Sequence, residues 1–295
     1  MESFAAIARE IAALAGVRCE PAPQQRVTGG SINTCYRWQG GAGAMFVKVG
    51  PEGARVAFEA EAAGLAELGG AGVLRVPRVL ACGRTHAAAF LALEWIETRP
   101  ADRWCEQRLG EGLAGLHAVT AARFGWLRDN TIGSTPQANG WSDDWAEFLR
   151  ERRLRPQLAL AASHGFAGEL ATRGARLLEC LPALLAGHRP VPSLLHGDLW
   201  GGNWLAAAGG EPVIFDPAVY YGDRETDVAM TRLFGGFGAP FYRAYEAALP
   251  FAPGARLRSE LYNLYHVLNH ANLFGGGYAR QAAAIIDRLL AEVGG

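Results

Sequence analysis

Two neighbouring segments decide the fold: LLHGDLWGGNW from Leu194 to Trp204, and VIFDP from Val213 to Pro217. Asn203 follows Asp198 by five positions, and Asp216 follows Asp198 by 18. The apolar residues that open each segment predict two short buried strands, which would carry these three polar side chains to one place. Carboxylate and amide oxygens are the ligands that Mg²⁺ prefers. The pattern therefore predicts magnesium held by Asn203 and Asp216.

The same spacing occurs in the catalytic loop of kinases, which reads H-x-D-x-x-x-x-N and is followed by a metal-binding acid. On this interpretation Asp198 accepts the proton of a substrate hydroxyl, and His196 braces the loop. A His-Gly-Asp triplet alone is more often a simple turn. The combination of the acid, the Asn and the second acid after an apolar strand favours phosphoryl transfer to an alcohol, with ATP as the donor.

Bulk composition excludes several other classes of protein. The chain has 295 residues, a formal net charge of −1 and no block of Lys or Arg, which argues against nucleic acid as the main partner. No apolar run reaches the length of a membrane span, and Met1-Glu2-Ser3 is unlike a signal peptide. The five cysteines lack CxxC spacing and are expected to be reduced thiols. We expect a cytoplasmic protein without a membrane or nucleic-acid partner, either a monomer or a homodimer.

The first third of the chain predicts a helix followed by an antiparallel sheet. Apolar residues from Phe4 to Leu14 recur at helical spacing. Strands are expected at 25–28, 34–38, 44–49, 76–80 and 87–96, with a helix at 53–68 between the third and the fourth. This arrangement matches the small lobe of a kinase-like protein.

Several residues of this region are candidates for binding ATP. Backbone N–H groups of the glycine turn could approach phosphate oxygens because Gly has no side chain in the way. Lys48 ends an apolar strand, and a helix glutamate could hold it on the phosphates; we choose Glu61, with Glu59 as the alternative. The backbone at the end of the fifth strand could bind adenine. The expected ATP-binding residues are Gly29, Gly30, Ser31, Lys48, Glu61, Glu94 and Ile96.

The rest of the chain is predominantly helical. Helices are expected from residue 102, at 141–163, 168–185, 226–234, 239–249, 256–274 and 278–293, with a loop at 125–141. His117 is expected to be a packed helix residue. The predicted fold is α+β, a protein-kinase-like two-lobed fold. Residues 1–97 form the nucleotide-binding lobe with a five-stranded antiparallel sheet, and 98–295 form a helical lobe with the catalytic and substrate sites.

With these motifs in view, the sequence resembles the aminoglycoside phosphotransferase and choline kinase group, and within it the fructosamine-3-kinase (ketosamine kinase) family. Trp200 and Trp204 flank the Gly-Gly-Asn of the loop, and Asp-Pro-Ala begins at Asp216 where protein kinases have Asp-Phe-Gly. The runs YYGDRETDVAM at 220–230 and LNHANLFGGGY at 268–278 are also similar to that family. The resemblance covers nearly the whole chain.

The resemblance implies ATP-dependent phosphorylation of the 3-hydroxyl of a sugar joined through C1 to an amine, as in ribulosamines and fructosamines on lysine. The phosphorylated adduct then breaks down, so the implied role is repair of glycated protein. Some eukaryotic relatives have a Cys in the phosphate-covering loop, whereas this chain has Gly-Gly-Ser-Ile-Asn. Redox control is therefore not carried over, and Cys35 is expected to be a packed strand residue.

Four residues are candidates for the substrate site. Trp200 is expected to wall the sugar-amine site, because Trp offers the best face to a cation and the amine would be protonated. Asp223, Glu225 and His270 are further candidates near the cationic substrate, with a structural role as the alternative for each. Asp227 is expected to accept hydrogen bonds from the backbone of the catalytic loop, or else to cap the helix that it begins.

Three other functions would use some of the same residues. A kinase for another small alcohol, such as an aminoglycoside, choline or homoserine, would keep the same catalytic residues. A non-catalytic nucleotide-binding relative would usually lack Lys48, Asp198, Asn203 or Asp216, and all four are present. A protein kinase is disfavoured because no Ala-Pro-Glu segment follows Asp216.

Overall fold

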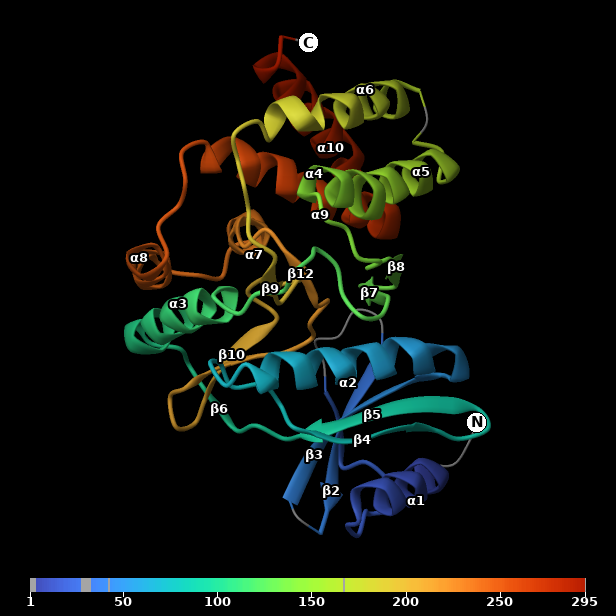
Figure 1. Cartoon of the computed structure of the whole chain (residues 1–295). Helices are drawn as coiled ribbons and strands as arrows, with labels where there is room; N and C mark the ends of the chain where they lie inside the picture. Colours follow the sequence, from blue (N-terminus) through green and yellow to red (C-terminus); the bar gives the residue numbers. More distant parts are fainter. Residues whose placement is uncertain (1–3, 28–32, 42, 167, 295) are drawn as a thin grey trace.

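A computed structural model describes residues 4–27, 33–41, 43–166 and 168–294. In Figure 1 a five-stranded antiparallel sheet with two helices forms one end of the molecule, and a larger helical part forms the other. The strand order is β1-β2-β3-β5-β4. The elements of this end are α1 (Phe4–Ala15), β1 (Gln25–Val27), β2 (Thr34–Gly40), β3 (Gly43–Pro51), α2 (Arg55–Gly70), β4 (Val79–Arg84) and β5 (Ala88–Glu94).

The sheet lies between the two helices because successive strand residues face opposite sides. On β5, Phe90 and Ala92 pack in a cluster with Ile7 and Ile11 of α1. Leu91 and its alternate neighbours pack instead with apolar residues of α2. Figure 1 shows α1 and α2 on the two faces accordingly. The predicted five-stranded sheet is confirmed.

The helical part begins as the chain leaves the sheet. Strand β6 (Thr98–Arg99) already pairs with β10, which belongs to the catalytic region. The other elements are α3 (Arg103–His117), β7 (Asn130–Ile132), β8 (Thr135–Gln137), α4 (Trp145–Phe148), a π-helical segment (Leu149–Leu154), α5 (Arg155–Ser163), α6 (Glu169–Leu184), β9 (Ser193–Leu195), β10 (Trp204–Ala207), β11 (Pro212–Ile214), β12 (Tyr220–Gly222), α7 (Glu225–Leu233), α8 (Ala239–Ala248), α9 (Ala255–Phe274) and α10 (Gly277–Glu292).

Three predicted elements differ from the structure. The strand expected at 76–80 begins only at Val79, after Pro77, which has no N–H to donate to a sheet. The loop expected at 125–141 contains the hairpin of β7 and β8, whose polar residues hid the strand pattern. The helix expected from residue 141 begins at Trp145, because Asp144 caps it by accepting a hydrogen bond from the Glu147 amide at 2.7 Å.

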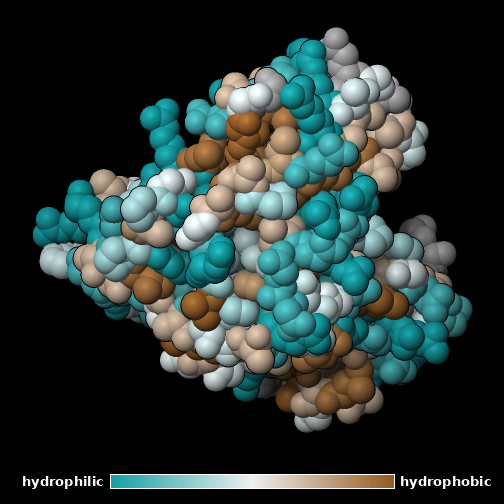
Figure 2. All heavy atoms as spheres, turned by 45° about the horizontal axis from the view of Figure 1, so that its top comes forward, coloured by the Kyte–Doolittle hydropathy of each residue, from teal (hydrophilic) through white to brown (hydrophobic). Residues whose placement is uncertain are grey.

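Figure 2 shows hydrophilic and hydrophobic residues mixed over the face in view, with the hydrophobic ones in several separate groups. Among the helices of the described residues, none combines the length and the hydropathy that crossing a membrane requires.

Candidate active site

Two short antiparallel strand pairs position the candidate catalytic residues. Strand β9 pairs with β12 and ends at Leu195, directly before His196. Strands β10 and β11 form a hairpin in which Trp204 lies opposite Ile214. One step further, the Phe215 amide donates to the Asn203 carbonyl at 3.0 Å. This register brings Asp216 beside the loop that carries Asp198.

Asp198 and Asn203 face each other within the loop. The Asn203 side-chain amide donates to the backbone oxygen of Asp198 at 2.9 Å and to its carboxylate at 3.2 Å. Because both bonds use Nδ2, the side-chain oxygen of Asn203 is left to serve as a ligand. Burial, and next the charge of Asp216, raise the pKa of Asp198 well above its usual value. A carboxylate with a raised pKa is a better proton acceptor than an exposed one.

The backbone at Asp216 adopts an unusual conformation. Its φ is +57°, the only positive φ outside glycine in the described ranges. Such a conformation costs free energy in an ordinary residue and is concentrated at functional sites. Nearby, Gly197 has φ +82°, and a Cβ there would lie 2.1 Å from the Ala218 carbonyl oxygen. The close approach of these two segments therefore requires glycine at 197.

Lys48 bridges the sheet to the catalytic region. Its ammonium lies 2.8 Å from Glu61 of α2 and also contacts the Asp216 carboxylate. Burial alone would lower the pKa of Lys48, but these two carboxylates outweigh it and the net shift is upward. Burial raises the pKa of Glu61 to about 7, against the opposing effect of Lys48. Glu59, the alternative to Glu61, pairs instead with Arg55 at 3.3 Å.

Asp227 holds the start of the catalytic loop. Its carboxylate accepts the backbone N–H groups of His196 at 2.7 Å and Gly197 at 2.8 Å. His117 of α3 reaches the same carboxylate at 3.2 Å, and its other ring nitrogen lies 2.8 Å from the Tyr245 hydroxyl. Burial would raise the pKa of Asp227, but the hydrogen bond from His117 and nearby charges lower it.

His196 is fully buried, and burial lowers its pKa. Its Nε2 donates to the Phe215 carbonyl at 2.9 Å, so the imidazole ties the loop to the end of β11. The sequence predicted only a packing role for His117. Its helical position in Gly-Leu-His carried no sign that it faces a carboxylate more than a hundred positions away.

The nucleotide-binding candidates are only partly visible. Gly29, Gly30 and Ser31 lie outside the described residues. The Glu94 amide donates to the Arg78 carbonyl at 2.9 Å, which takes that N–H out of consideration for adenine. Ile96 follows β5 in the connection to the helical part.

Trp200 is exposed, whereas His270 is half-buried. Trp200 is 40% exposed, and its ring lies over Gly202, where a Cβ would be within 2.3 Å of the indole. His270 on α9 donates from Nδ1 to the His266 carbonyl at 2.9 Å. Its ring lies 4.5 Å from Phe234, measured between ring centroids.

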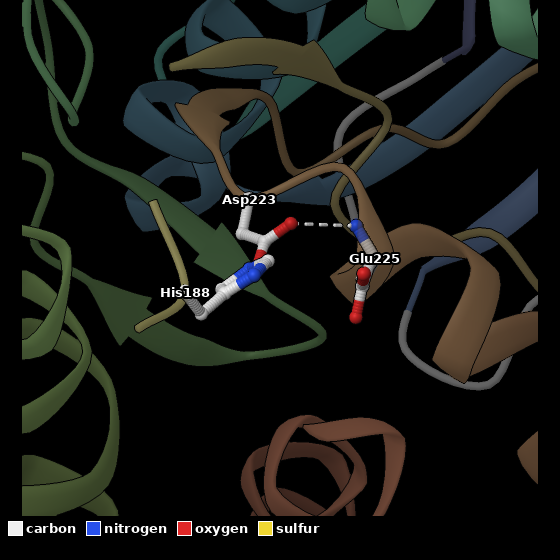
Figure 3. A group of neighbouring side chains, drawn as sticks. All are labelled: His188, Asp223 and Glu225. Carbon is white, nitrogen blue, oxygen red and sulfur yellow. Dashed lines mark hydrogen bonds and ion pairs between the residues drawn. The ribbon is translucent and has the colours of Figure 1, made fainter. Parts of the chain in front are cut away.

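For Asp223 and Glu225, which were candidates to lie near a cationic substrate, the contacts favour the alternative, a structural role. The two acids are only 1% and 4% exposed. The Asp223 carboxylate accepts the Tyr262 hydroxyl at 2.5 Å and lies 2.6 Å from Nε2 of His188. Figure 3 shows the His188 ring beside this carboxylate, which also accepts the backbone N–H of Glu225 at 3.0 Å. Arg258 makes two hydrogen bonds to Glu225, at 2.7 and 2.8 Å. The three grouped side chains resemble a metal site, but Arg258 already supplies the positive charge.

With the geometry in place, comparison with known proteins gives the family. A family model described as fructosamine kinase matches residues 3–292. The chain belongs to the fructosamine kinase family. A Synechocystis protein named "Probable ketoamine kinase" is 45% identical over 285 residues, covering 96% of both chains. A rice protein named protein-ribulosamine 3-kinase, chloroplastic, is 41% identical, covering 90% of this chain and 78% of its own.

Solved structures agree with this assignment. A candidate fructosamine-3-kinase from Thermobifida fusca has a TM-score of 0.85 at 33% identity, covering 97% of this chain and 98% of its own. An aminoglycoside phosphotransferase structure, APH(4)-Ia, has a TM-score of 0.60 at 16% identity, covering 98% and 99%, and this likeness concerns the fold alone. The predicted kinase-like α+β fold, the family and the class of enzyme, a phosphotransferase, are confirmed.

Proposed function

We propose that this protein is an ATP-dependent ketosamine 3-kinase, which phosphorylates the 3-hydroxyl of a ribulosamine or fructosamine. The observation that carries the proposal is the convergence of Lys48, Asp198, Asn203 and Asp216 from separate segments. The names of the relatives support the class of substrate. ATP would bind between the proposed lobes, residues 1–97 and 98–295.

The residues present fit magnesium. The free side-chain oxygen of Asn203 and the carboxylate of Asp216 are hard oxygen donors, and the hydrogen bonds of Asn203 orient its oxygen away from Asp198. When bound, Mg²⁺ neutralises the phosphate charge. The ion pair between Lys48 and Asp216 is then expected to open, so that Lys48, held by Glu61, can bind phosphate oxygens.

Asp198 is the proposed catalytic residue. Phosphoryl transfer depends on alignment and charge neutralisation more than on covalent help. Asp198 would accept a hydrogen bond from the substrate hydroxyl and then its proton, and its raised pKa suits that role. Asn203 fixes the direction of the carboxylate, while Asp227 and His196 hold the backbone of the loop.

Trp200 and His270 are the proposed substrate residues. The exposed indole can face the protonated amine of a ketosamine, since cations bind well to the face of Trp. In His270, Nδ1 donates to a carbonyl, so in the neutral ring Nε2 is an acceptor for an N–H or O–H of the substrate. Phosphorylation at O3 would release the adduct from a free or protein-bound lysine, a deglycation role that we expect in the cytoplasm.

A second candidate is a kinase for another small alcohol, since the fold is shared with APH(4)-Ia. A panel of acceptors separates the two candidates. Initial rates of ADP formation would be measured with MgATP and ribulosyl-lysine, fructosyl-lysine, kanamycin, choline or homoserine. We expect turnover on the ketosamines only. Turnover confined to the other alcohols would replace the proposed substrate class.

A further inference from the structure

A hydrogen bond joins the helix that carries Glu61 to the region of the catalytic loop. The Tyr221 hydroxyl donates to the carboxylate of Glu67 at 2.7 Å. Glu67 lies on α2, less than two turns beyond Glu61. Tyr221 lies on β12, opposite Leu194 of β9, the strand that leads into the catalytic loop. The bond therefore connects the two parts of the molecule next to the site.

A close backbone approach on the same helix reinforces this connection. Gly64 lies between Glu61 and Glu67, and a Cβ there would be 3.2 Å from Val219 and 3.3 Å from Pro217. Pro217 directly follows Asp216. The helix thus contacts the short segment that runs from Asp216 to the start of β12.

Tyr221 is held firmly enough to position another element. Its backbone exchanges two hydrogen bonds with Gly125, at 2.8 and 2.9 Å. Its ring lies 6.3 Å from that of Trp141. Burial and the neighbouring Glu67 carboxylate raise the pKa of the Tyr221 hydroxyl, which therefore stays a donor.

We propose that Tyr221 and Glu67, together with the contact at Gly64, form a clamp that holds α2 in the orientation in which Glu61 pairs with Lys48. Tyr221 and Glu67 are positioning residues, because they act through Glu61. In a kinase-like fold the pairing of this lysine and glutamate must be in place for activity. The inference rests on the proposed function, in which Lys48 binds the phosphates of ATP.

The test is the affinity for a non-hydrolysable MgATP analogue, measured by titration calorimetry on the full chain. Tyr221→Phe removes only the donor, and Glu67→Leu removes only the acceptor. Each should weaken binding about tenfold, the order of one hydrogen bond to a charged group. Glu67→Gln keeps an acceptor oxygen and should retain most of the affinity. Tyr242→Phe on α8, far from α2 in Figure 1, is the matched control and should bind as the unmodified protein does.

Irreversible unfolding would lower the active fraction without changing the dissociation constant. Reversible unfolding would weaken the apparent affinity, so urea unfolding of each variant must show that the protein is almost fully folded under the conditions of the titration. The Glu61→Gln background provides the second readout, because there Tyr221→Phe should cause little further weakening. Unchanged affinity in Tyr221→Phe and Glu67→Leu would overturn the clamp, as would a full tenfold effect in the Glu61→Gln background. The measurement contains no sugar, so its failure is distinct from the failure of the ketosamine assignment in the acceptor panel.

Discussion

Two groups of acids in the helical part differ in how their charges are satisfied. Asp223 and Glu225 are buried and bound by the chain itself, through His188, Tyr262 and Arg258. At the other group, Asn203 uses its amide nitrogen for the hydrogen bonds to Asp198, which leaves its side-chain oxygen available as a ligand, and Asp216 is held in an unusual backbone conformation. Acids saturated by internal partners stabilise a fold, whereas acids left with unused oxygens can bind and react.

The largest expected effect concerns Asp198, where a substitution should lower activity without lowering stability. Asp198→Asn keeps the size of the side chain but cannot accept a proton. Turnover should fall about 10³-fold, within the usual range for a lost general base. The midpoint of thermal unfolding should stay equal or rise, because a carboxylate with a raised pKa is replaced by a neutral group. Steady-state kinetics and calorimetry on the same sample test this, and activity near the original level would remove Asp198 from its role.

At the buried pair of Glu225 and Arg258 the reverse is expected: a substitution should lower stability without lowering activity. Arg258→Met leaves Glu225 buried without its ion-pair partner and should cost about 3 kcal/mol of stability. Urea unfolding measures the loss, and the KM values for ATP and sugar should not change in the protein that remains folded. The double variant Arg258→Met with Glu225→Gln is the control, since it removes both charges and should recover part of the loss. A large rise in the KM for the sugar would return Glu225 to the substrate site.

The buried His266 sharpens the comparison because it forms no ion pair with an acid among the described residues. Burial lowers the pKa of His266 to about 3, with a further contribution from His270, against the opposing effect of Asp227. The unfolded chain then binds a proton below pH 6.5 that the folded protein does not. Stability is therefore lost as pH falls, by about 2 kcal/mol between pH 6.5 and 5.0 for one such group.

His266→Asn should remove that contribution from the pH dependence. Urea unfolding at several pH values, with the unmodified protein alongside, measures the difference in slope. An identical slope in both proteins would show that His266 is protonated in the folded state.

The smallest expected effect concerns Trp200, which is exposed beside the Asp198 loop. Trp200→Ala should raise the KM for a ketosamine about fivefold, which corresponds to about 1 kcal/mol for a cation over an aromatic ring. Trp200→Phe should recover part of it, and an uncharged N-acylated analogue should show no difference between the variants. Equal losses on charged and uncharged acceptors would reduce Trp200 to a packing residue.

The sequence predicted most of the fold because its patterns are local. The alternation along the strands and the helical spacing of apolar residues follow from the geometry of each element alone. The spacing of Asp198, Asn203 and Asp216 also predicted that these residues lie close together, since a tight hairpin connects Asn203 with Asp216. The resemblance to the fructosamine kinase family rested on this block together with the runs at 220–230 and 268–278.

What the sequence did not reveal depends on contacts between distant segments. His117 and Asp227 are 110 positions apart, and Tyr221 and Glu67 are 154 apart. Asp223 and Glu225 looked like substrate acids because the charge-rich run at 220–230 gives no sign of Arg258 or Tyr262. Only the packing of α7 against α9 shows that these acids are already neutralised.

The most direct test of the central claim is the position of the phosphate in the product. Ribulosyl-lysine would be converted with MgATP, and the product examined by two-dimensional phosphorus–proton NMR without prior separation. Besides the signals of ADP, we predict a single new phosphorus signal, which is coupled to the proton on C3. Coupling of that signal to a proton on another carbon, or formation of ADP with no phosphorylated sugar at the earliest times, would contradict it.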